Sequence, residues 1–144
     1  EHDAEGNTTE DPKLIKENAD VRMGKVGLIK KELGRFQTVK VFGNPKSKNI
    51  IVGWGSNKTV ILDAIEGLDC KFVQVIYIKP LPEQVKKELE NAEKIILIES
   101  NVTGQLGNVI AEETGILIKN KILKYDGRPF YSDELRKDIE MKLK

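Results

Sequence analysis

The segment 94–115, KIILIESNVTGQLGNVIAEETG, decides the fold of this chain. Its apolar run Ile95–Ile98 is typical of a strand that is buried on both faces, as in a parallel sheet between two layers of helices. From Thr103 the spacing of apolar residues becomes helical, and Gly115 is a residue type that commonly ends a helix. The residues expected to face inward from this helix are Leu106, Val109 and Ile110. A strand followed directly by a helix indicates an α/β fold.

The same alternation of short β-branched runs and amphipathic helices continues on both sides of this segment. The predicted strands are Val39–Phe42, Ile50–Val52, Phe72–Ile78, Lys94–Glu99 and Lys121–Tyr125. The other predicted helices begin at Ser56, Pro82 and Ser132, and we expect both serines to act as N-caps. Because right-handed crossovers join such units, the sequence predicts a three-layer α/β/α fold with a mostly parallel sheet of about five strands.

The start of the chain has a different character. We expect residues 1–35 to form a linker followed by a helix, and residues 36–144 to form the α/β domain. Glu1–Asp11 is polar and is expected to be an extended linker. It lacks the basic start and apolar stretch of a signal peptide, so we expect a cytoplasmic location. Because the first residue is Glu1 rather than Met, we expect the chain to be part of a longer protein.

A helix is predicted between this linker and the α/β domain. Asp11 followed by Pro12 is a favourable start for a helix, and apolar spacing continues to Leu33. Gly24 and Gly27 each cost about 1 kcal/mol in a helix interior. We therefore expect this helix to need a neighbour or to break near Gly24.

Composition excludes several classes of protein. The chain has 144 residues, 39% apolar and 33% charged, which allows a core under a charged surface. The 24 basic and 23 acidic residues are scattered, which argues against nucleic-acid binding. No apolar run approaches the roughly 20 residues of a membrane-spanning helix. The single cysteine, Cys70, is expected to be buried; it cannot form an intramolecular disulfide or a multi-cysteine metal site.

The residues that usually carry catalysis are sparse. His2 is the only histidine and lies in the predicted linker, so a Ser-His-Asp or Cys-His arrangement would require the linker to fold over the domain. His2, Asp3 and Glu5 have the side chains of metal ligands, but such a polar cluster is usually solvated. We therefore expect no catalytic, cofactor-binding or metal-binding residue in the chain.

Two polar segments follow predicted strands. The turn 53–57, GWGSN, precedes a helix, where backbone amides can bind an anion, although a plain tight turn is favoured because the fingerprints of nucleotide-binding loops are missing. The polar segment 99–105, ESNVTGQ, lies at the end of the predicted strand Lys94–Glu99, and it is a candidate either for binding or for helix capping. Because parallel strands end on one side of a sheet, we expect the two segments to meet there.

Several short motifs, in order along the chain, resemble one enzyme family. They are Glu1-His2-Asp3 with Gly6, Glu10-Asp11-Pro12, Arg22-Met23 with Lys25, Val52-Gly53-Trp54-Gly55-Ser56, Lys79-Pro80-Leu81-Pro82, Glu99-Ser100-Asn101 with Thr103-Gly104-Gln105-Leu106, and Lys124-Tyr125-Asp126-Gly127-Arg128-Pro129-Phe130. Together they are similar to the C-terminal part of the alpha subunit of archaeal and bacterial 2-oxoacid:ferredoxin oxidoreductases. The resemblance implies that residues 1–35 leave the preceding domain.

The resemblance also implies a fold like the transketolase C-terminal domain, with Val39–Phe42 as an antiparallel edge strand. The whole enzyme is expected to decarboxylate a 2-oxoacid on thiamine diphosphate with magnesium, to reduce ferredoxin through iron-sulfur clusters and to form an acyl-coenzyme A. Those groups are expected in the rest of the alpha subunit, in the thiamine-binding beta subunit and in other subunits. The identity of the 2-oxoacid and the subunit stoichiometry are not predicted from this segment.

The expected role of the chain is therefore structural, as an interface domain. The candidate interface residues are Gly53, Trp54, Gly55, Ser56, Asn57, Asn101, Thr103, Gly104, Gln105 and Arg128. One alternative is a free-standing binding module that uses the turn 53–57 for a phosphate-bearing ligand such as coenzyme A. Another is the C-terminal domain of a different transketolase-like enzyme.

Overall fold

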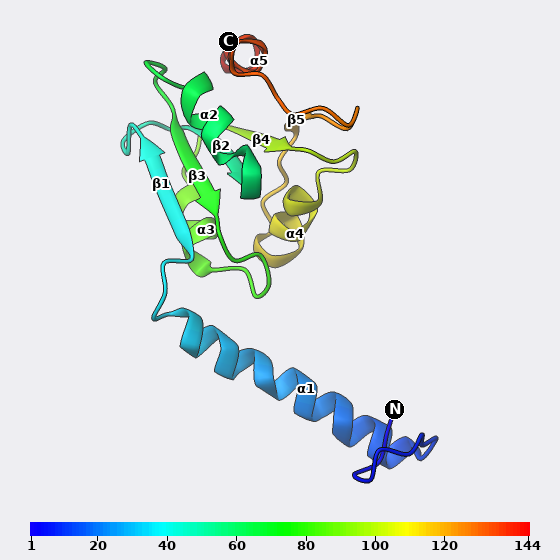
Figure 1. The fold of residues 1–144 in the computed structure, drawn as a ribbon. Coiled ribbons are helices and arrows are strands. Elements are labelled where there is room, and N and C mark those ends of the chain that lie inside the picture. Colours follow the sequence, from blue (N-terminus) through cyan, green and yellow to red (C-terminus); the bar gives the residue numbers. More distant parts are fainter. The chain divides into compact units, whose positions relative to one another are not determined.

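Residues 1–144 are all described by a computed structural model, in which the chain forms two compact units, Glu1–Phe36 and Gln37–Lys144. The second unit contains a single five-stranded sheet (Figure 1). Its strands are β1 (Val39–Gly43), β2 (Asn49–Trp54), β3 (Lys71–Val75), β4 (Lys94–Glu99) and β5 (Asn120–Leu123). Their order in the sheet is β1-β3-β2-β4-β5.

Only one strand of this sheet runs antiparallel to its neighbour. Strand β1 lies at the edge and pairs with β3 in antiparallel register, with Val39 opposite Val75. The pairs β2–β3, β2–β4 and β4–β5 are all parallel. The predicted α/β fold with a mostly parallel sheet and an antiparallel edge strand is therefore confirmed.

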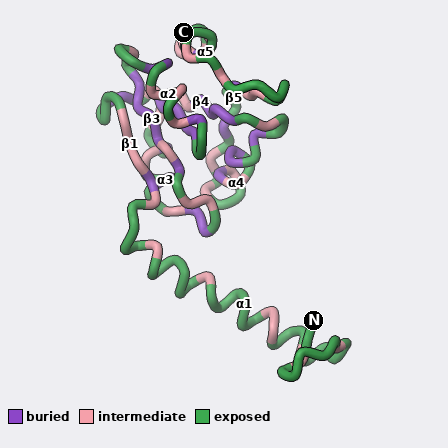
Figure 2. Tube along the Cα trace, in the orientation of Figure 1, coloured by how far each residue is buried: buried purple, intermediate pink, exposed green.

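Helices cover both faces of the sheet and produce two separate cores. On one face, α3 (Glu83–Leu89) and α4 (Gln105–Thr114) pack against side chains that include Val52, Val73 and Leu97. On the other face, α2 (Lys58–Ala64) and α5 (Ser132–Leu143) cover Phe72, Ile96 and Ile98. Successive residues of a strand point to opposite faces, which is why the run Ile95–Ile98 supplies both cores. Figure 2 shows that the buried residues concentrate in these strands and the helix faces above them.

Three predicted helix starts are wrong by one or two residues. Ser56 does not cap α2, because Gly55–Asn57 forms a short 3₁₀-helix and α2 begins at Lys58. Thr103 does not begin α4, because Gly104 adopts a left-handed conformation with φ +68° and the helix can start only after it. Ser132 is the first residue of α5 rather than its cap.

Strands β3 and β5 are shorter than predicted, for a common reason. The last residue of each strand lies opposite a terminal residue of a neighbouring strand, so no further pairing is available. Strand β3 stops at Val75, opposite the first residue of β1, and Ile76 N then donates to Thr38 O at 3.0 Å. Strand β5 stops at Leu123, opposite the last residue of β4. Hydrophobic runs therefore overestimate strand length where the partner strand is short.

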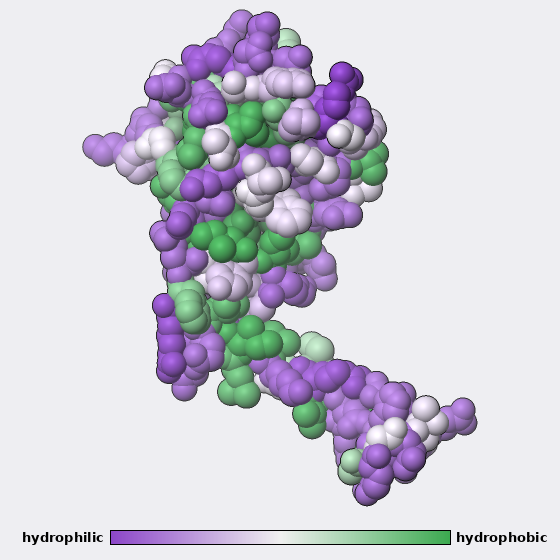
Figure 3. All heavy atoms as spheres, viewed as in Figure 1, coloured by the Kyte–Doolittle hydropathy of each residue, from purple (hydrophilic) through white to green (hydrophobic).

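The first unit consists mainly of α1 (Pro12–Leu33), which is 22 residues long and contains no buried residue. The predicted helix start is confirmed, because the Asp11 side chain accepts a hydrogen bond from Lys13 N at 2.9 Å. The helix does not break at Gly24. Figure 3 shows apolar side chains among charged ones on the surface of this segment. No helix of the structure has the length and apolar character needed to cross a membrane.

Residues before α1 form a closed turn rather than the expected extended linker. An isolated antiparallel bridge joins His2 to Thr8. The turn is attached to α1 because Asn18 Nδ2 donates to the His2 carbonyl at 3.0 Å. Arg22 also donates to both carboxylate oxygens of Glu1, at 2.6 and 2.8 Å. Polar composition alone did not reveal these contacts, which join residues 16 and 21 positions apart.

Candidate functional site

The two polar segments meet at the carboxyl ends of β2 and β4, and we call this edge of the sheet the rim. The meeting follows from topology, because β2 and β4 are adjacent and parallel. Trp54, the last residue of β2, donates from its indole Nε1 to Glu99 Oε1 at 2.9 Å. Ser100, which follows β4, donates from its hydroxyl to Asn57 Oδ1 at 2.9 Å. Side chains that are far apart in sequence therefore connect the turn 53–57 to the segment after β4.

Glu99 is the centre of the rim and is completely buried. Its Oε1 accepts from Trp54 Nε1 at 2.9 Å and from Asn101 Nδ2 at 3.0 Å. The backbone N–H of Leu106 lies 3.0 and 3.1 Å from the two carboxylate oxygens, and Gly107 N is 3.5 Å from Oε2. The carboxylate therefore occupies the N-terminus of α4, where free N–H groups and the helix dipole favour negative charge.

Asn101 closes the turn that leads into α4. Its Oδ1 accepts from the backbone N–H of Gly104 at 2.7 Å, of Thr103 at 3.2 Å and of Gln105 at 3.3 Å. Thr103 is exposed, and its carbonyl accepts from Lys121 Nζ at 3.5 Å. Of the residues in the segment 99–105, the side chains of Asn101 and Glu99 accept from the backbone amides at the start of α4.

A side chain at Gly53 would collide with the core, and one at Gly104 would make tight contacts with its neighbours. A Cβ atom on Gly53 would lie 2.8 Å from Ile61 Cδ1, so this glycine allows α2 to pack closely on β2. A Cβ atom on Gly104 would lie 3.1 to 3.3 Å from the side chains of Lys121 and Leu97. Gln105, by contrast, is exposed at the first position of α4 and is free to contact another protein.

Ser56 and Asn57 line an open cleft of about 450 Å³, whereas Gly55 does not. Its lining includes hydroxyl groups from Thr59, Ser100 and Ser132, in addition to Ser56 and Asn57. Asn57 is buried, whereas Gly55 and Ser56 are exposed. The lining also contains the apolar side chains of Val60, Pro129 and Phe130, so this side of the rim is an open cleft of mixed polarity.

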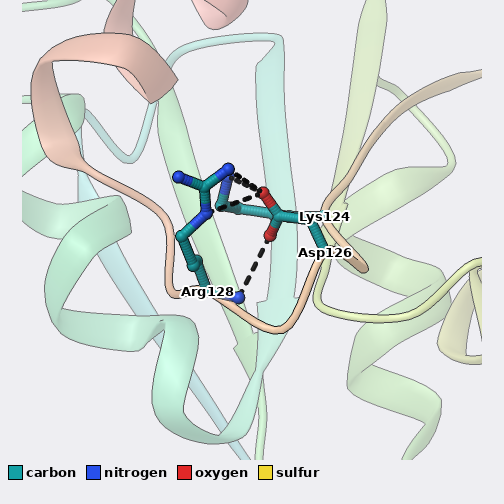
Figure 4. Close-up of polar contacts among 3 residues, drawn as sticks. All are labelled: Lys124, Asp126 and Arg128. Carbon is teal, nitrogen blue, oxygen red and sulfur yellow. Dashed lines mark hydrogen bonds and ion pairs between the residues drawn. The ribbon is translucent and has the colours of Figure 1, made fainter.

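Arg128 lies in the loop that follows β5 and is held by a local ion-pair cluster (Figure 4). Lys124 Nζ, Arg128 Nε and Arg128 Nη2 each lie 3.2 Å from Asp126 Oδ2. Arg128 N donates to Asp126 Oδ1 at 3.1 Å. This backbone hydrogen bond is the largest cause that lowers the pKa of the Asp126 carboxyl, and the contacts with Lys124 and Arg128 lower it further. The Arg128 side chain is 71% exposed despite these contacts.

Cys70 and His2 belong to residue types that act as nucleophiles or metal ligands in other proteins, but their surroundings here do not favour such chemistry. Cys70 is buried, as predicted, and burial is the main cause that raises the pKa of its thiol to about 11, with the nearby charge of Asp69 adding to the effect. The thiol is therefore protonated at neutral pH. His2 lies in the turn of the first unit. No three His, Cys, Asp or Glu side chains are grouped closely enough to hold a metal ion.

The polar segment 99–105 predicted from the sequence contains Glu99, but the candidate interface residues did not include it. A usable signal was present, namely an acidic residue that directly ends a fully apolar strand and stands a few residues before a helix. Charged residues are rarely buried without partners, so such a carboxylate is expected either to turn outward or to be satisfied by nearby donors. The structure shows the second outcome.

Comparisons with known proteins identify relatives over nearly the whole chain, although no protein-family model matches it. Subunit alpha of 2-oxoacid:ferredoxin oxidoreductase 1 from Sulfurisphaera tokodaii is 34% identical over 142 residues, which cover 96% of this chain. The alpha subunit of the corresponding enzyme from Saccharolobus solfataricus is 35% identical over 146 residues, which cover 97%. The chain spans about a quarter of the length of these curated relatives, 23% in both cases.

Two solved structures extend this comparison. A 2-oxoglutarate:ferredoxin oxidoreductase from Magnetococcus marinus, solved with 2-oxoglutarate, coenzyme A and succinyl-CoA bound, has the same fold over the whole of this chain and 26% of its own, with a TM-score of 0.80 at 23% identity. The alpha chain of a probable 2-oxoacid ferredoxin oxidoreductase from Thermoplasma acidophilum is 38% identical, with 98% of that chain and 74% of this one covered at a TM-score of 0.50. The chain therefore belongs to the family of 2-oxoacid:ferredoxin oxidoreductase alpha subunits.

Proposed function

We propose that this C-terminal portion of an alpha subunit is a supporting domain whose rim contacts another domain or subunit of the same enzyme. The main support for this proposal is that the one carboxylate at the centre of the rim is occupied by hydrogen bonds within the domain. The Glu99 carboxylate, which could otherwise act as an acid, base or ligand, is buried and receives hydrogen bonds from two side chains and two backbone amides. The polar groups that stay exposed, such as Gln105, suit hydrogen bonding to a protein surface.

The whole enzyme would carry out thiamine diphosphate-dependent oxidative decarboxylation of a 2-oxoacid to an acyl-coenzyme A, with reduction of ferredoxin. We place thiamine diphosphate, magnesium and the iron-sulfur clusters in other parts of that assembly, because cluster ligation requires several cysteines and this chain contributes one. The thiamine-binding beta subunit is the expected partner. A cytoplasmic location is supported by the single cysteine, which is a buried, free thiol.

Replacement of Gln105 by Ala in the complete alpha subunit tests this proposal. Because Gln105 is exposed, the change should alter the free energy of unfolding by less than about 0.5 kcal/mol. We expect co-purification of the partner subunit, or activity of the assembled enzyme, to fall. Gln84→Ala, at an exposed position of α3, is the matched control and should change neither. Full assembly and activity of the Gln105 variant would contradict the proposed interface.

Titration of the chain with coenzyme A tests the alternative of a free-standing binding module. The family relationship and the proposed supporting role predict no saturable binding at the turn 53–57. Saturable binding that is lost on changing Ser56 would favour the alternative.

A further inference from the structure

Large apolar side chains are exposed at the carboxyl ends of four consecutive strands. Trp54 is the last residue of β2, and Ile76, Val102 and Tyr125 follow β3, β4 and β5; these four side chains are 36%, 40%, 60% and 67% exposed. Across the sheet, from β3 to β5, these residues are arranged in the order Ile76, Trp54, Val102 and Tyr125. We call them the strand-end row. Adjacent strands are spaced by about 4.8 Å, so the row extends over roughly 14 Å from β3 to β5. That width suits a protein surface better than a small molecule.

The central aromatic residue of the row is fixed in place before any partner binds. The hydrogen bond from Trp54 Nε1 to Glu99, at 2.9 Å, ties the indole ring to a carboxylate that the N-terminus of α4 also holds. A side chain that is ordered in advance loses less conformational entropy on binding. Trp, Tyr and Arg are also the residue types that contribute most at protein interfaces.

The charge beside the row is mainly positive. The segments that continue from the four strand ends, 54–58, 76–79, 99–104 and 124–128, contain Lys58, Lys79, Lys124 and Arg128, of which Lys79 is already paired with Glu113 in α4. Their acidic residues are the buried Glu99 and the exposed Asp126. Lys124 and Arg128 both pair with Asp126, so one positive charge of this cluster is not neutralised by it. That charge can form an ion pair with a carboxylate of a partner. Charge complementarity therefore favours an acidic partner surface.

From these features we infer that the strand-end row binds a partner protein with an apolar patch bordered by carboxylates, and that Arg128 contacts one of them. Trp54 and Tyr125 are its apolar anchors. The inference rests on the proposed role of the rim as an interface and adds the chemistry of the partner. An anionic membrane would also combine with aromatic and basic residues, but the fixed indole and the hydrogen-bonding groups of the rim favour a structured protein.

The test measures the dissociation constant between the complete alpha subunit and the subunit that co-purifies with it, at low and high salt. Arg128→Glu should weaken binding at least tenfold at low salt and reduce its salt dependence, because it reverses the charge offered to the partner. Lys137→Glu makes the same change at an exposed position of α5 and should leave binding unchanged. Tyr125→Ala should weaken binding at both salt concentrations without affecting the fold, since this residue is exposed.

The possible results separate the two proposals. Weaker binding by the Tyr125 and Gln105 variants, with no effect of Arg128→Glu, would reject the acidic partner and keep the interface. Unchanged binding by all three variants would reject both. Pelleting of the alpha subunit with vesicles containing anionic lipid, abolished by Arg128→Glu, would replace the protein partner by a membrane.

Discussion

Replacing Glu99 with Gln should destabilise the second unit, because the rim depends on a buried carboxylate with two acceptor oxygens. Glutamine has nearly the same shape but keeps only one acceptor. If that oxygen keeps the place of Oε1, it still accepts from Trp54, Asn101 and Leu106 N. The new NH₂ group takes the place of Oε2, which faces the N–H groups of Leu106 and Gly107. Donors would then meet donors at the start of α4.

The expected loss follows from the contacts that disappear. Leaving a buried donor without an acceptor costs about 1–3 kcal/mol, and hydrogen bonds to charged groups are stronger than those between neutral ones. The new side-chain NH₂ would be a buried donor that meets two backbone donors and no acceptor, so we take this one group as the main effect and expect about 2 kcal/mol. For a domain of about 100 residues this lowers Tm by roughly 8 °C.

Urea unfolding followed by tryptophan fluorescence is the suitable assay, because Trp54 is the only tryptophan and lies in this network. The native emission should also change, since the indole N–H loses a charged acceptor. Glu112→Gln, at an exposed position of α4, is the control and should stay within about 0.5 kcal/mol of the parent. A Glu99 variant as stable as this control, with unchanged emission, would refute the stabilising role of the carboxylate.

Two further predictions concern α4 and Cys70. Asn101→Ala should cost about 1–2 kcal/mol because three backbone amides lose their acceptor, whereas Thr103→Ala should cost less than about 0.5 kcal/mol; equal shifts in thermal melts would argue against this assignment of the cap. The pKa of the Cys70 thiol rises from 9.0 to about 11 on folding, so its contribution to stability should be complete below about pH 9 and should be lost between about pH 9 and 11. Urea midpoints across this range should fall less in Cys70→Ala, and a parent protein with the same pH profile as that variant would contradict the prediction.

Hydrophobic pattern was sufficient to predict the elements that bury apolar side chains on both faces. Strand β4 has the predicted bounds Lys94–Glu99, and α4 ends at the predicted Gly115. The meeting of the turn 53–57 with the segment after β4 also followed from the parallel arrangement of β2 and β4. These features depend on hydrophobic periodicity and on the alternation of strands and helices, and both can be recognised in the sequence.

Helix starts and the centre of the rim depend on contacts that local patterns do not display. Ser56, Thr103 and Ser132 are residue types that often cap helices, yet none of them does so here. The N-terminus of α4 is satisfied instead by Asn101 and by Glu99, which lies seven residues before Leu106. At α4, the buried carboxylate at the end of β4 therefore takes the role that local capping preferences would assign to a residue beside the helix.

The long helix α1 also affects how the stability of this chain is measured. None of its 22 residues is buried, so its hydrogen bonds and caps supply most of its order, and a helix of this kind melts gradually. Far-ultraviolet circular dichroism sums this gradual loss with the cooperative unfolding of the second unit. Trp54 fluorescence reports only the latter. The two signals therefore have different midpoints, and no single Tm describes the whole chain.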